Sequence, residues 1–384
     1  RPDVWYNNYD GVKLGFHFNG DYMNYHHKVN ANIWLNTAFL QDYNYYDDYQ
    51  NEYNPLSFRF KYNTGLDKFS KHTDITLNIK LLDGLNLNKI KLKKYDYSKK
   101  NMFYASFKSM YRANESDLRY TNYKVWESDK FNNTATFGWT HSYKHKVGNG
   151  ELNFEITSST IGSDYDYSKL VLTSVHKSKL GKLQLNTRLF GQYGSGTNWA
   201  GESRLNLAGA NSEELMENKF TRSEGFIPNQ WLGYGSTTNH FQMGGGLNLR
   251  GYAGYYAPEI NDEGNYVLSY NGNSGASISA ELEFQNIFSL DRIFGLPLKS
   301  YLFADAGIIN TTQITRENYK EAFSKLRSDA GLGFAVTLNE WGPLQMVEPI
   351  TLRLDLPFFL NRYPSVDEDY IQTNRFVVGI GRTF

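Results

Sequence analysis

Residue patterns typical of catalysis are sparse in this chain of 384 residues. It contains no His-Glu-x-x-His zinc motif, no Gly-x-Ser-x-Gly nucleophile elbow and no phosphate-binding loop. His141 and His145 share one face of a predicted strand, but at the rise of a strand they lie ~13 Å apart and cannot share a metal ion. Cysteine is absent, which excludes disulfides and thiolate metal sites. We therefore expect no catalytic residue, no metal site and no cofactor.

The most informative stretch contains three glycines followed by a Leu-Arg-Gly-Tyr tip: Gly244, Gly245, Gly246, Arg250, Gly251 and Tyr252. It lies inside the longest predicted connection, 194–273, and a loop of this length is uncommon unless it is functional or folds back onto the protein. Such a loop needs an anchor. Arginine suits this role because its planar guanidinium holds carboxylates in a two-pronged geometry and stays charged when desolvated.

Carboxylates that could receive this arginine follow on two predicted strands. In 274–287 the apolar residues Ile278 and Leu282 share one face, so Glu283 and the other polar residues point to the opposite face. In 299–309 the same alternation turns Asp305 inward. We therefore predict that Arg250 reaches into the interior of the protein and pairs with Glu283 and Asp305.

The elements that must position these residues are strands, because apolar residues recur at every second position through most of the chain. Fifteen runs show this pattern: 11–19, 28–40, 55–64, 72–82, 87–95, 101–112, 132–147, 150–161, 166–178, 181–193, 274–287, 299–309, 328–338, 349–358 and 374–384. A sixteenth, at 4–9, precedes an Asp-Gly turn signal. Helical patterns are limited to 213–219 and 317–327.

The lengths of the connections favour a barrel that crosses an outer membrane. Such barrels have short turns on the periplasmic side and long loops outside. Three connections are short and three are long: 65–71, 146–150 and 178–182, against 41–54, 113–131 and 194–273. The three long connections lie on the same side of the barrel only if a strand precedes residue 11. We predict an all-β fold, a 16-stranded antiparallel transmembrane β-barrel over residues 1–384, with the long extracellular loop 194–273 folded into the lumen.

Composition narrows the alternatives. The 40 basic and 40 acidic residues cancel, so the chain offers no basic field for nucleic acid. No apolar run approaches the ~18 residues of a spanning helix, and residues 1–25 lack a leader pattern, so an export signal would lie upstream of Arg1. A soluble β-sandwich or propeller would also alternate, but the runs here exceed the ~5 to 6 residues of ordinary strands, and no ~40-residue repeat occurs.

The order of short motifs in residues 240–384 resembles the BamA/TamA-like outer-membrane assembly and translocation barrels. The motifs are the Leu-Arg-Gly-Tyr tip, Leu282-Glu283-Phe284, Phe303-Ala304-Asp305-Ala306-Gly307, Gly331-Leu332-Gly333, Gly342-Pro343-Leu344 and the segment 376–384. Earlier residues match by strand pattern only. The resemblance implies that Arg250 pairs with Glu283 and Asp305. It also implies a lateral seam between the first and last strands, with a closing strand and C-terminal aromatic signal at Phe376, Val378, Ile380 and Phe384.

Two functions follow from this resemblance. In the first, the seam opens and exposes unpaired backbone to a client strand during protein assembly or translocation. In the second, the barrel is a membrane anchor or conduit for a fused aminopeptidase N-like metallopeptidase of the kind found in Bacteroidetes, to which segment 201–239 is similar. No POTRA repeats, usual in the first class, occur in this chain. We expect a bacterial outer-membrane location, with outer-membrane lipid, lipopolysaccharide and client proteins as partners and no nucleic acid.

Overall fold

The structure is a computed structural model, and strands account for 67% of it and helices for 4%. It describes residues 1–384 except 9, 24–25, 42–54, 83, 113–124, 219, 224, 229–230, 232–239, 255–256, 261–265, 288–297, 315–318, 339–349, 363–374 and 382–383. The Gly342-Pro343-Leu344 motif lies outside the described residues. No helix in the described ranges is long and apolar enough to cross a membrane.

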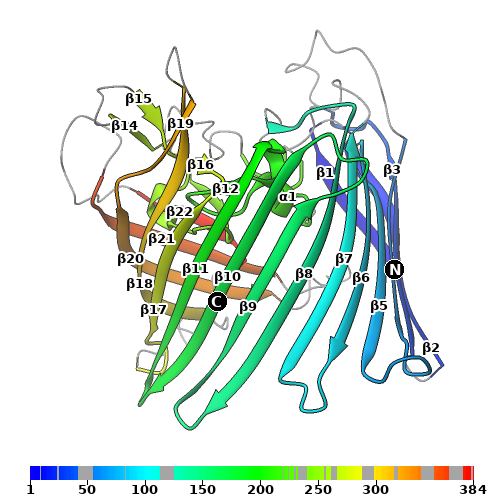
Figure 1. Cartoon of the computed structure of the whole chain (residues 1–384), viewed down its shortest axis with the longest axis horizontal. Coiled ribbons are helices and arrows are strands. Elements are labelled where there is room, and N and C mark those ends of the chain that lie inside the picture. Colours follow the sequence, from blue (N-terminus) through cyan, green and yellow to red (C-terminus); the bar gives the residue numbers. More distant parts are fainter. Residues whose placement is uncertain are drawn as a thin grey trace.

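Sixteen antiparallel strands follow one another as hydrogen-bonded neighbours in chain order and form the wall of a barrel (Figure 1). They are β1 (Pro2–Asn7), β2 (Gly11–Tyr22), β3 (His27–Asn36), β4 (Leu56–Gly65), β5 (Thr73–Leu82), β6 (Leu85–Tyr95), β7 (Asn101–Arg112), β8 (Lys130–His145), β9 (Gly148–Ser159), β10 (Asp166–Leu180), β11 (Leu183–Asn198), β17 (Gly275–Glu283), β18 (Leu298–Ile314), β20 (Arg327–Leu338), β21 (Ile350–Leu360) and β22 (Val377–Ile380). The predicted all-β, 16-stranded fold is confirmed, and β1 is the strand required before residue 11.

Two further strands, β19 (Tyr319–Phe323) and β13 (Phe241–Met243), complete the sheet of eighteen. β19 pairs with residues 310–314 of β18, so the helical turn predicted for 317–327 is wrong. The reason is tertiary: β18 continues past the barrel wall, and its free backbone groups offer a pairing that outweighs local helical preference. β13 comes from the long loop and pairs in parallel with β22.

Side chains of the sixteen strands separate into an apolar outer face and a polar inner face. On β3, Ile33 and Leu35 are 54% and 55% exposed, whereas Trp34 between them is 3% exposed. On β18, Leu302 faces outward at 47%, while Asp305 is buried at 2%. This is the alternation expected of a wall with hydrocarbon outside and polar groups inside.

Most of the described part of the connection between β11 and β17, within residues 199–274, folds back into the barrel, and we call this described part the plug. Its described elements are the 3-10 turns η3 (Gly201–Ser203) and η4 (Arg250–Tyr252), the helix α1 (Ser212–Leu215), and the short strands β12 (Leu205–Asn206), β13, β14 (Pro258–Ile260), β15 (Tyr266–Leu268) and β16 (Asn271–Gly272). Leu247, Leu249 and Tyr252 pack with Ile309 of β18 and Leu360 of β21. This apolar cluster fastens the plug to the wall.

The last strand is shorter than predicted. A closing strand was expected over 374–384, but β22 contains only Val377–Ile380. Gly381 follows it with φ +78°, a left-handed conformation that favours glycine and ends the strand. Phe376 precedes the strand, and Phe384 lies in no strand. Within the described residues β1 pairs with β2 alone, and β22 does not pair with β1.

Candidate functional site

Arg250 lies at the tip of the plug, in η4, with its side chain fully buried. Its Nε and Nη2 donate to the two carboxylate oxygens of Asp305 at 2.8 and 2.9 Å, and its Nη1 donates to Oε1 of Glu281 at 2.6 Å. The ring centroid of Phe303 lies 4.2 Å from the guanidinium carbon. Burial alone would lower the pKa of Arg250, but Asp305 and Glu281 hold it well above its ordinary value. The buried arginine therefore remains charged.

Glu283, the other predicted partner of Arg250, does not contact it. Its carboxylate accepts hydrogen bonds from Asn186 and Gln285, each at 2.9 Å. Asp305 lies directly across from Ser279, which makes Glu283 two residues more distant than Glu281, or ~7 Å along the strand. Both glutamates face the lumen, so alternation could not separate them. The register between β17 and β18 therefore places Glu281, and not Glu283, beside Arg250.

The two residues after Arg250 bind the tip to the neighbouring strands. A Cβ atom on Gly251 would lie 2.7 Å from Cβ of Asp329 on β20, so only glycine fits this approach. The Tyr252 hydroxyl donates to Oδ1 of Asn361 at 2.9 Å and accepts from the Arg362 amide at 3.2 Å. The tip thus contacts β17, β18, β20 and the end of β21.

The three predicted glycines lie on the path of the plug backbone from β22 to the tip. Gly244 donates its amide to the carbonyl of Ile380 at 3.1 Å. Gly246 has φ +52°, which turns the chain, and its carbonyl accepts from Nη2 of Arg188 on β11 at 2.9 Å. Gly245, between them, packs closely on Ala210. The glycines therefore allow the plug backbone to leave β22 and pack tightly on itself.

The opposite side of the plug is acidic and contacts a basic wall. Helix α1 begins with a capping box, in which the side chains of Asn211 and Glu214 each accept from the other residue's backbone amide at 2.9 Å. Beside it, Glu213 pairs with Lys108 of β7, and Glu217 pairs with Lys80 of β5. Sequence reasoning missed these pairs, because loop carboxylates have no periodicity to assign them partners.

The acidic side also holds two carboxylates with shifted pKa values. Burial alone would raise the pKa of Glu213, but the ammonium of Lys108 lowers it to about 2. Burial raises the pKa of Glu202 to about 7, although Asn132 of β8 donates to its Oε1 at 2.6 Å. Glu213 is therefore a permanent anion, whereas Glu202 titrates near neutral pH.

The described residues within 220–244 of the plug, which we call the strap, lie between the first and last strands. The carbonyl of His240 accepts from the Val378 amide at 2.5 Å, and Gln242 accepts from Nη2 of Arg353 on β21 at 2.5 Å. On the other side, the guanidinium of Arg222 lies 4.6 Å from the ring of Trp5 on β1. The strap therefore contacts both β1 and β22 from inside the lumen.

Of the predicted C-terminal residues, three contact the strap. The Phe376 ring stacks on His240 with centroids 3.9 Å apart. Val378 lies across from Phe241 in the β13–β22 pair, and Ile380 lies across from Met243. Phe384 is half-buried and outside any strand. Within the described residues, no group of three or more His, Asp or Glu side chains is arranged to hold a metal ion.

Comparison with solved structures finds barrels over nearly the whole chain. BamA from Haemophilus ducreyi lacking POTRA domains 1–3 is 14% identical, with a TM-score of 0.48, over 98% of this chain and 69% of that one. CdiB from Escherichia coli is 12% identical, with a TM-score of 0.48, over 98% of this chain. This chain spans 60% of that CdiB chain. The Pseudomonas aeruginosa outer membrane protein opdK is 11% identical, with a TM-score of 0.40, over 92% of this chain and 90% of that one. No family model and no curated protein sequence matches the chain.

Proposed function

We propose that residues 1–384 form one bacterial outer-membrane barrel that receives client polypeptide at the seam between β1 and β22, in outer-membrane protein assembly or translocation. The outward apolar face, with Ile33, Leu35 and Leu302 about half exposed, supports a surrounding bilayer. The polar, plug-filled lumen supports a role other than free diffusion. The alternative anchor role for a fused peptidase has no support among the observations above.

One observation carries this proposal: the second edge of β22 is paired with the strap strand β13 and not with β1. An unpaired strand edge is a template for another strand, and proteins cover such edges when they are not in use. Here the cover is three residues long and parallel, a pairing slightly weaker per residue than an antiparallel one. An incoming antiparallel strand could therefore replace β13 on β22, a recognition mode known as β-augmentation.

The plug is fastened so that the strap can leave while the tip stays in place. Arg250 and Tyr252 hold the tip on β17, β18 and the end of β21, whereas the strap rests on β1, β22 and Arg353 of β21. The two attachments share no residue. We infer that Arg250, Gly251 and Tyr252 act as the fixed anchor, assisted by Asp305 and Glu281, and that the strap is the part exchanged for the client.

A disulfide lock tests the proposal, and the chain has no cysteine of its own to interfere. Met243→Cys with Ile380→Cys joins register partners of β13 and β22. Ala135→Cys with Ser158→Cys joins register partners of β8 and β9 and is the matched control. In proteoliposomes, oxidation of the first pair should slow insertion of an unfolded outer-membrane barrel at least about tenfold, with recovery after reduction. An unchanged rate in the oxidised, cross-linked protein would refute strand exchange on β22.

A further inference from the structure

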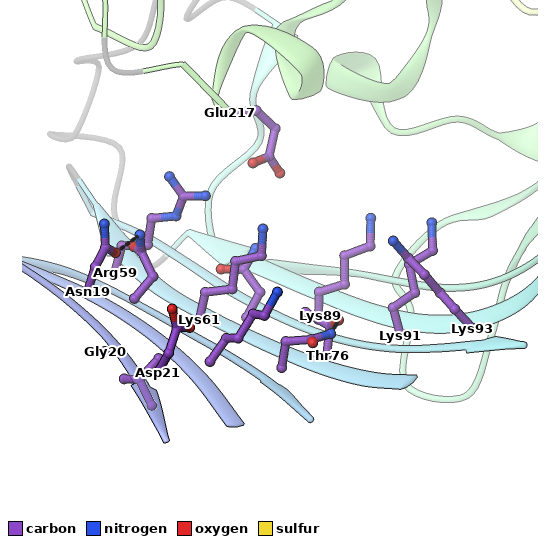
Figure 2. A pocket seen from close by; sticks show the side chains of 15 residues that line it. Asn19, Gly20, Asp21, Arg59, Lys61, Thr76, Lys89, Lys91, Lys93 and Glu217 are labelled. Atoms are coloured by element: carbon purple, nitrogen blue, oxygen red, sulfur yellow. Dashed lines mark hydrogen bonds between the residues drawn. The ribbon is translucent and has the colours of Figure 1, made fainter. Parts of the chain in front are cut away.

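A basic cavity of about 760 Å³ lies in the lumen against strands β2 to β6, a size typical of small-molecule sites. Six cations line it, against the two carboxylates Asp21 and Glu217. The cations are Lys28, Arg59, Lys61, Lys89, Lys91 and Lys93. Figure 2 shows the labelled basic side chains projecting from the strands toward Glu217 of the plug. The lining therefore carries a net charge of +4, from six positive and two negative groups.

Within the described residues these cations form no ion pair, although Glu217 attracts Arg59 and Lys89, and Glu155 attracts Lys91, at longer range. Among the ion pairs and hydrogen bonds formed by the described residues, none involves any of the six. Glu217 is already bound to Lys80, and Nε of Arg59 is buried without a hydrogen-bond acceptor. The ammonium of Lys91 lies 3.6 Å from the ring centroid of Tyr104, a contact that supplies no counter-charge. Crowded like charges are unfavourable, so a bound anion would stabilise this wall.

The strands place the cations in a regular array. Lys89, Lys91 and Lys93 alternate on β6, so neighbours are ~7 Å apart on one face. Lys61 and Lys89 lie on either side of Asn78 in register, two strands or ~10 Å apart. The side-chain amide of Asn78 adds a neutral hydrogen-bond donor between them. This spacing suits several anionic groups on one molecule better than a single small ion.

We propose that this cavity binds a small molecule carrying two or more phosphate groups. Lys89, Lys91 and Lys93 would bind the phosphates as point charges, and Arg59 would donate a two-pronged pair of hydrogen bonds from the opposite side. The ligand could be a soluble polyphosphorylated compound or the phosphorylated sugar headgroup of a lipid, since both present the same chemistry. The site is on the wall opposite Arg250 and does not depend on opening of the seam.

Isothermal titration calorimetry of the full chain in detergent micelles tests this proposal. One arm uses sodium tripolyphosphate, and the other uses micelles containing lipid A. We expect saturable binding of one ligand per chain that weakens as salt is added. The triple variant Lys89→Gln, Lys91→Gln, Lys93→Gln should bind at least about tenfold more weakly. The corresponding triple change to arginine should retain binding.

The matched control removes three positive charges outside the cavity. Lys68, Lys71 and Lys99 are exposed in turns, and changing all three to glutamine should alter affinity less than about twofold. Heat-modifiable migration verifies folding of each variant, and Lys91→Gln alone, with an expected loss of about threefold, replaces the triple if that fails to fold.

Tripolyphosphate binding would support a soluble ligand, and binding of lipid A alone would support a headgroup, provided that the cavity variants lose it. Absence of saturable binding of both probes to the natural sequence would overturn the proposal. Equal losses in the cavity and turn triples, or unchanged affinity in the cavity variants, would also overturn it.

Discussion

The guanidinium of Arg250 and the carboxylate of Asp305 form a two-pronged ion pair, with Nε–Oδ2 and Nη2–Oδ1 distances of 2.8 and 2.9 Å. Asp305 also accepts from the Arg250 backbone amide at 3.3 Å. One carboxylate on β18 therefore fixes both the side chain and the backbone of the plug tip. The buried pair contributes to holding the plug because removing either partner would leave an uncompensated charge.

Asp305→Asn should therefore loosen the tip. Arg250 would keep its ion pair with Glu281 but lose the two-pronged one, and we expect the free energy of plug opening to fall by about 3 kcal/mol. Limited proteolysis of the plug in micelles, followed over time, measures this change. Glu283→Gln is the control, because Glu283 bonds Asn186 and Gln285 instead of Arg250. Equal protease sensitivity in the two variants would contradict the assignment of Asp305 as the anchor.

Gly251→Ala should displace the tip by steric conflict. The added methyl would lie 2.7 Å from Cβ of Asp329, on a strand that cannot easily move. We expect a loss of about 1 to 3 kcal/mol in plug protection, as for overpacking of a core. Gly191→Ala on β11 is the control, since its methyl would meet no atom within 4 Å. Hydrogen exchange of the plug amides compares the two, and equal protection would argue against this close approach.

Reversing the charges of the Lys108–Glu213 pair should separate charge pairing from other effects. Lys108→Glu alone places two carboxylates together and should expose the α1 region to protease. Adding Glu213→Lys restores opposite charges and should recover at least half of the lost protection, because the pair is mostly shielded from solvent and therefore weakly screened. No recovery in the double variant would mean that the contact matters through shape alone.

Glu202 should make plug protection depend on pH. Its pKa is about 7 in the folded state, above the value of about 4.3 for an unfolded glutamate, so folding favours the protonated form. The stabilisation of the folded plug by protonated Glu202 is therefore complete below about pH 4.3 and is lost as pH rises through 7. It is on the order of 3 kcal/mol in all.

Hydrogen exchange of the plug between pH 5 and 8, corrected for the intrinsic exchange rate, checks this dependence. Glu202→Gln, which keeps the shape of the side chain, should remove most of it and give better protection than the natural sequence at pH 8. If plug protection changed with pH equally in Glu202→Gln and in the natural chain, another group would be responsible for the pH dependence.

Strand pattern made most of the barrel predictable from sequence. Period-two alternation located the walls within a few residues, since lipid-facing and lumen-facing positions differ strongly in polarity. Turn lengths and the Asp-Gly turn signal both indicated a strand before residue 11, where β1 lies. The helical interpretation of 317–327 failed because the pairing of β19 with the projecting end of β18 depends on tertiary structure.

The sequence predicted which residues of the site face the lumen, but not which of them contact one another. Arg250 and Asp305 were identified because an arginine at a loop tip and an inward carboxylate are readable from local sequence. Choosing Glu281 over Glu283 required the register of two strands. Glu213, Glu217 and β13 escaped prediction because their partners are distant in the chain and no periodicity marks them.

The doubly attached plug also constrains the order of events during biogenesis. Its residues precede β17 to β22 in the chain, yet its contacts reach strands from both halves of the wall. If the barrel closed before the plug had entered it, the plug could not reach these contacts. We therefore expect the plug to pack against the early strands before β17 to β22 pair. Because β22 has only four residues, it is suited to pair last, after the plug has packed inside the barrel.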